Sequence, residues 1–82
     1  MKLPIIRQFY QNQTPENLEA TLEVLESFSE FRSVSEEDLN VAGELITNIC
    51  GALEVHANVA NGMSEKDALN SFAQKVMGSI DK

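Results

Sequence analysis

The sequence is poor in the side chains from which small proteins build covalent links and metal centres. Its 82 residues include one cysteine, one histidine and no tryptophan. A single cysteine allows no disulfide within the chain and no multi-cysteine metal site. Aromatic residues make up only 6% of the chain, so the core must come mainly from aliphatic side chains. These absences predict a fold held together by packing, with no metal and no other cofactor.

Positive charge is also scarce. Six Lys and Arg residues stand against 13 Asp and Glu residues, which gives a formal net charge of -7. The six bases are scattered along the chain and form no basic patch. A protein this acidic is repelled by nucleic acid and by anionic membranes. We therefore expect neither among its partners, and we interpret the acidity as a means of keeping the protein soluble.

Long apolar runs are missing as well. After Met1 and Lys2 only four apolar residues precede Arg7, whereas a secretory signal needs a longer apolar stretch. No segment approaches the length of a membrane span. The sequence therefore predicts a cytoplasmic protein. Its length and the lack of a linker predict one helical domain over residues 1–82.

What the sequence does contain is a series of helix start and stop signals. Three residues are typical N-caps and are followed by Pro or by acidic residues that suit the first turn: Thr14, Ser35 and Ser64. Asn61-Gly62 is typical of a helix end. No strand-type alternation is present. We predict an all-α fold, a small four-helix bundle with antiparallel neighbours, whose helices span about 4–12, 15–31, 36–61 and 65–80.

The helix predicted over residues 36–61 is apolar over most of its circumference. One row of side chains follows steps of three and four: Leu39, Ala42, Ile46, Ile49, Leu53, His56 and Ala60. A helix of about 26 residues is roughly 39 Å long, whereas a compact domain of this size is only about 30 Å across. Either the helix breaks, with Gly51 the favoured place, or a second subunit covers it. We favour a homodimer with this row as its self-association seam.

Three further features of the predicted helices bear on packing. Small residues recur at steps of seven at Gly43, Cys50 and Ala57, which would let another helix approach closely. A second apolar row lies beside the seam at Val41, Leu45, Ala52, Val55 and Val59. The last helix is expected to turn one face inward, formed by Ala68, Leu69, Phe72, Val76, Met77 and Ile80.

Five glutamates on the second predicted helix share one face: Glu16, Glu19, Glu23, Glu26 and Glu30. Like charges at neighbouring helix positions repel one another, so we interpret this face as solvated, with docking of a basic partner as the alternative. The turn over residues 61–64 superficially resembles a helix-turn-helix. The helix after it starts with Glu65-Lys66-Asp67, which does not suit contacts to base edges.

Histidine and cysteine are the candidates for chemistry. The positions three and four residues from His56 are Ala52, Leu53, Val59 and Ala60, so no second metal ligand lies beside it on the helix. Cys50 is about 120° round the helix from His56, and the two cannot form a nucleophile–base pair within one chain. We expect His56 to be a packed or interface histidine and Cys50 to be a buried structural thiol.

From Met1 to Arg7, and again from Gly43 to Ile46 and from Gly51 to His56, the chain resembles a family of small uncharacterised bacterial all-helical proteins. The resemblance covers most of the chain. It implies no activity, cofactor or catalytic residue.

The sequence thus predicts a non-catalytic helical protein-interaction module that self-associates. One alternative is a small enzyme or ligand carrier whose site is assembled between subunits around His56 and Cys50. A carboxylate or second histidine beside His56 would favour that alternative, and apolar neighbours would favour packing. A third interpretation, a redox-responsive adaptor, requires Cys50 to be exposed.

Overall fold

A computed structural model describes residues 3–80 of the chain, and it describes side chains over residues 3–75. Within this range the fold is all-α and contains no strand. The four helices are α1 (Leu3–Asn12), α2 (Pro15–Ser29), α3 (Glu36–Ala60) and α4 (Glu65–Ile80). Every helix predicted from the sequence is confirmed, and the bounds differ from the prediction by two residues or fewer.

The predicted N-caps explain where three of the helices begin. Thr14 Oγ1 accepts a hydrogen bond of 3.2 Å from the Asn17 amide. Ser35 and Ser64 each accept one of 3.1 Å from the amide three residues further on. Each bond satisfies an amide that has no partner inside its helix. After α3, Gly62 has a φ of 109°, a left-handed conformation that glycine adopts without strain.

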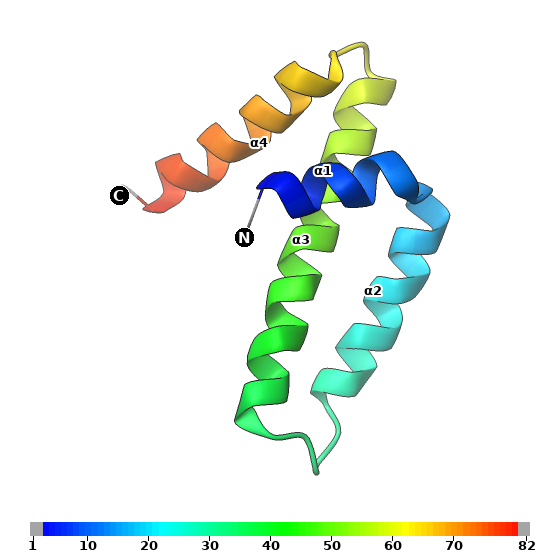
Figure 1. Cartoon of the computed structure of the whole chain (residues 1–82), viewed down its shortest axis with the longest axis vertical. Helices are drawn as coiled ribbons and strands as arrows, with labels where there is room; N and C mark the ends of the chain where they lie inside the picture. Colours follow the sequence, from blue (N-terminus) through cyan, green and yellow to red (C-terminus); the bar gives the residue numbers. More distant parts are fainter. Residues whose placement is uncertain (1–2, 81–82) are drawn as a thin grey trace.

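The long helix α3 lies at the centre and contacts each of the other three helices. Figure 1 shows α2 antiparallel to one half of α3, α1 crossing over α3, and α4 diverging from the end of α3. The predicted antiparallel packing therefore holds for α2 and α3, whereas α1 and α4 cross or diverge from their neighbours. The molecule is a thin slab with principal extents of 43 × 32 × 17 Å.

The α3 helix runs unbroken through Gly51, so the alternative of a break at this glycine was wrong. Gly51 is buried, and a Cβ atom placed there would lie 2.8 Å from Ile6 Cδ1 and 3.0 Å from the Phe72 ring. Helix α1 supplies Ile6 and helix α4 supplies Phe72. The missing side chain thus lets two helices approach α3 at the same point.

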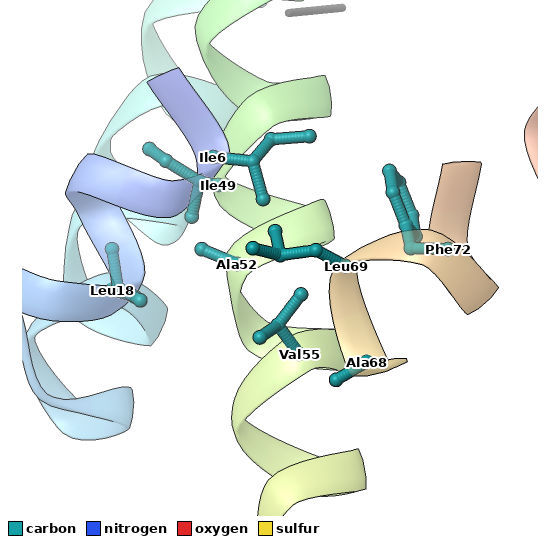
Figure 2. Packing of buried hydrophobic residues seen from close by; sticks show 8 residues of the cluster. All are labelled: Ile6, Leu18, Ile49, Ala52, Val55, Ala68, Leu69 and Phe72. Carbon is teal, nitrogen blue, oxygen red and sulfur yellow. The ribbon is translucent and has the colours of Figure 1, made fainter. Parts of the chain in front are cut away.

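All four helices contribute to one small apolar core (Figure 2), which consists of Ile6, Leu18, Ile49, Ala52, Val55, Ala68, Leu69 and Phe72. As the composition predicted, seven of these eight side chains are aliphatic. Three of the α4 residues expected to face inward are therefore in the core. The side chains of Val76, Met77 and Ile80 lie outside the described residues.

Candidate interaction surfaces

The middle of the predicted self-association seam is covered by the chain itself. Ile49 is 2% exposed and Ala42 is 3% exposed. Leu53 and His56 are half-buried, and Leu53 packs against the core. These residues offer little or no surface to a second subunit, so the seam as predicted needs correction. The physical reason is that α1 and α2 bring their own apolar side chains, among them Ile6 and Leu18, to this part of α3.

The two ends of the predicted seam are more accessible. Leu39 is 39% exposed and Ala60 is exposed, whereas Ile46 is half-buried like Leu53 and His56. On the Leu39 side of the helix lie the small residues Gly43, Cys50 and Ala57, all exposed. We name the uncharged row made by these side chains the outer stripe, and it consists of Leu39, Gly43, Ile46, Cys50 and Ala57.

No other element in the described part of the chain packs against the outer stripe at Gly43. A Cβ atom placed on this glycine would have no atom of another element within 4 Å. Cys50 is a free, exposed thiol, so the prediction of a buried structural thiol was wrong. The close approach that small residues were expected to permit takes place at Gly51, on a different side of α3.

His56 connects α3 to the turn between α1 and α2. Its Nε2 atom lies 3.0 Å from the Gln13 carbonyl oxygen. Because a carbonyl oxygen only accepts, Nε2 carries the proton in this contact. The Tyr10 ring packs on the imidazole with centroids 4.5 Å apart. A backbone carbonyl and an aromatic ring hold the imidazole in place, and neither is the carboxylate or histidine that would favour a catalytic or ligand site.

The structure does not bring Cys50 and His56 together within one chain, since Cys50 is exposed and His56 packs on Tyr10. Over the residues whose side chains are described, no three His, Cys, Asp or Glu side chains are grouped to hold a metal ion.

A second accessible surface lies between α1, α2 and the first half of α3. It contains two neighbouring hollows of about 200 and 150 Å³ that share Val41 and Leu45. We name this surface the apolar groove, and its apolar lining consists of Ile5, Leu25, Phe28, Val41, Ala42 and Leu45. Its polar lining residues are Asp38, Glu44 and Asn48.

Exposed apolar side chains gather at the same end of the molecule. Val41 is 60% exposed, Phe31 59% and Val24 67%. Phe31 contacts Phe28 edge to face, with ring centroids 6.1 Å apart. Val24 is one helical turn before Phe28 and so lies on the same side of α2. Apolar side chains therefore remain exposed at the end of the α2–α3 hairpin where the connecting loop lies.

Charge is divided between the helices. Neither α2 nor α3 contains a Lys or Arg residue, whereas α2 carries four glutamates and α3 carries five acidic residues. The glutamates of α2 are exposed, as expected of a solvated face. The described cations of the helices, Arg7, Lys66 and Lys75, lie on α1 and α4. Two of them, Arg7 and Lys66, line a separate hollow of about 130 Å³ between these helices.

Sequence reasoning missed the groove for an identifiable reason. The sequence placed Val41 and Leu45 in a regular apolar row beside the predicted seam, and no prediction was made for Asn48. Asn48 is 3% exposed, the buried polar residue of this region. Asn48 interrupts the apolar row between Leu45 and Ala52. This polar position was the signal in the sequence that the row passes from an accessible part of α3 to a buried part.

None of the described helices is long and apolar enough to cross a membrane. The fold defines a small all-α protein organised around one long central helix. The chain belongs to a family of unknown function (DUF6952), whose match covers residues 1–81. This membership confirms the resemblance to an uncharacterised family. No curated protein and no solved structure matches the chain.

Proposed function

We propose that this protein is a non-catalytic helical interaction module that self-associates, as a homodimer, through the outer stripe of α3. The observation that carries the proposal is the stripe itself, a row of uncharged side chains whose members Gly43, Cys50 and Ala57 are exposed. Small residues on one helix face allow a second helix to pack closely against it. The setting we propose is the bacterial cytoplasm.

The shape of the molecule supports this proposal. A compact chain of this length has a radius of gyration of about 12 Å, whereas this one has 13.6 Å. A Cβ atom placed on Gly43 would have no atom of another helix within 4 Å. One side of α3 is therefore left without a covering helix, and small domains often gain stability by covering such a surface with a second subunit.

The test is the mass of the protein in solution. Light scattering at micromolar concentration should give at least twice the chain mass of 9.1 kDa. Cys50→Glu places a charge on the outer stripe and should give the monomer mass, because a charge buried at an interface is costly. Asn40→Glu adds the same charge to the same helix at an exposed position outside the stripe, and it should leave the mass unchanged.

Circular dichroism should show the same helix content for the wild type and both variants, because all the changed side chains are exposed in the single chain. A monomeric wild type would refute the proposal. Equal dissociation by both substitutions would show that general charge repulsion, and not the stripe, controls association.

A second candidate, the redox-responsive adaptor, gains support from one observation. It required an exposed thiol, and Cys50 is exposed. Because Cys50 is the only cysteine, any disulfide that it forms with another copy links two chains covalently. Mild oxidation followed by non-reducing electrophoresis tests this, and Cys50→Ser is the control. A band of the single chain alone after oxidation would remove the candidate.

A further inference from the structure

We propose that the apolar groove binds a basic amphipathic helix of a partner protein. The inference rests on the proposed function in that it treats the chain as an interaction module, but it concerns a different surface. Val41 in the groove and Gly43 in the outer stripe are two residues apart, which places them about 200° apart around α3. Occupation of one surface therefore leaves the other accessible.

The groove has the dimensions of a helix-binding site. Its lining residues on α3 extend from Asp38 to Asn48, a distance of about 15 Å at 1.5 Å per residue. That length matches about three turns of a partner helix. Each of the two hollows, of about 200 and 150 Å³, has room for one bulky apolar group, since a cavity of about 150 Å³ admits benzene.

The two hollows lie next to each other and share Val41 and Leu45. They would therefore accept apolar side chains spaced three or four residues apart on the partner, the usual pattern when a helix binds in a groove. The Phe28–Phe31 aromatic pair extends the apolar surface at the end of α2. Aromatic side chains in such positions are frequent anchors of binding energy.

Charge decides which partner fits. Two carboxylates, Asp38 and Glu44, line the hollows directly. Neither helix that forms the long walls of the groove contains a Lys or Arg residue. A partner with Lys or Arg on both sides of its apolar row would pair with these carboxylates. A second copy, whose net charge is also -7, would be repelled by these carboxylates and is the poorer occupant.

The test uses three synthetic peptides of equal length. The first is a helix with Leu at steps of three and four and Lys at the other positions. The second has Glu in place of every Lys, and the third has the composition of the first with its Leu residues spread round the helix. We expect the first to bind with micromolar affinity, and the other two to bind at least tenfold more weakly. The affinity of the first peptide should fall as the salt concentration rises.

Substitutions in the protein locate the binding. Val41→Ser should weaken the first peptide about tenfold, because it removes exposed apolar surface that binding would bury. Met63→Ser is the matched control, since Met63 is also an exposed apolar residue but does not line the groove. Glu44→Gln should weaken binding a few-fold and reduce its salt dependence, whereas Glu19→Gln, on the exposed face of α2, should have no effect.

NMR spectra provide the last readout. The first peptide should shift the methyl signals of Leu25, Val41 and Leu45 and leave Val55 in the core unchanged. Equal affinity for the first and third peptides would overturn the inference, because attraction of opposite charges alone would explain the binding. Shifts of the same methyl signals on raising the protein concentration without peptide would also overturn it, since a second copy would then occupy the groove.

The result is separable from the test of self-association. Val41→Ser should leave the mass in solution unchanged, and Cys50→Glu should leave peptide affinity unchanged. A monomer that binds the first peptide would refute the homodimer and support the groove. A dimer that binds none of the three peptides would support the homodimer and refute binding in the groove.

Discussion

Two glycines of α3 provide a matched pair of substitutions for testing the fold. Both lie inside the same helix, where replacing Gly by Ala stabilises by about 0.5–1 kcal/mol through backbone entropy alone. At Gly43 a new Cβ atom would meet nothing within 4 Å in the single chain, so Gly43→Ala should give that gain in full when all variants are compared in the monomeric Cys50→Glu background. At Gly51 the same atom would lie 2.8 Å from Ile6 Cδ1 and 3.0 Å from the Phe72 ring.

The contacts at Gly51 should reverse the sign of the effect. Ile6 is 0% exposed and Phe72 is 9% exposed, so neither side chain has open space into which it can move. Overpacking of this kind costs about 1–3 kcal/mol. After the gain in helix propensity, Gly51→Ala should lower the free energy of unfolding by up to about 2 kcal/mol. The two Ala variants should therefore differ by about 1–3 kcal/mol.

A third substitution tests the cause. Ile6→Val removes Cδ1, the atom nearest to the new methyl group. Alone it should cost about 0.5–1.5 kcal/mol, because Ile6 is fully buried. Combined with Gly51→Ala it should cost less than the sum of the two single changes, since one removes the atom with which the other collides.

Urea denaturation followed by circular dichroism measures all four variants, at one protein concentration because self-association would make stability depend on it. Each 1 kcal/mol corresponds to a shift in melting temperature of about 4–8 °C for a domain of this size. If Gly51→Ala stabilised the protein as much as Gly43→Ala, then α1 and α4 would not meet α3 at this glycine, and the arrangement in Figure 1 would be wrong.

Three further predictions concern single side chains. Ile49→Asp should unfold the protein or cost several kcal/mol, because Ile49 is 2% exposed and the new charge has no partner; near-native thermal stability would contradict this. Ser35→Ala should lower the unfolding free energy by about 1 kcal/mol through loss of the N-cap of α3, while Ser33→Ala, in the preceding loop, should change it little. His56→Leu should cost about 0.5–1.5 kcal/mol through loss of the hydrogen bond to the Gln13 carbonyl, measured by denaturation; a more stable leucine variant would show that the bond contributes nothing.

The helices could be predicted from the sequence because the signals for their ends are local. The Thr14, Ser35 and Ser64 side chains bond to amides three residues away, and no other part of the fold is needed to make these contacts. The continuity of α3 was less accessible, because Gly51 is compatible with either a break or a close approach. Only the positions of Ile6 and Phe72 decide between them.

The surfaces of α3 could not be assigned from periodicity. The helix carries two apolar rows with the same spacing, and each changes its surroundings along its length. In one row Leu39 is exposed while Ile49 is buried, and in the other Val41 is exposed while Val55 is buried. Which residues are covered depends on where α1, α2 and α4 cross α3. That information comes from contacts distant in sequence, such as the one between His56 and Gln13.

The uncovered surfaces of α3 differ in chemistry, and this difference should separate their partners. The outer stripe is uncharged, so two copies can pack there without bringing carboxylates into direct contact. The apolar groove has Asp38 and Glu44 in its lining, so it suits a cation better than another acidic chain. Self-association should therefore strengthen with added salt, which screens the net charge of -7 on each chain. Binding in the groove should weaken with the same salt, because screening there removes an attraction. One helix can thus serve both interactions in a chain of 82 residues.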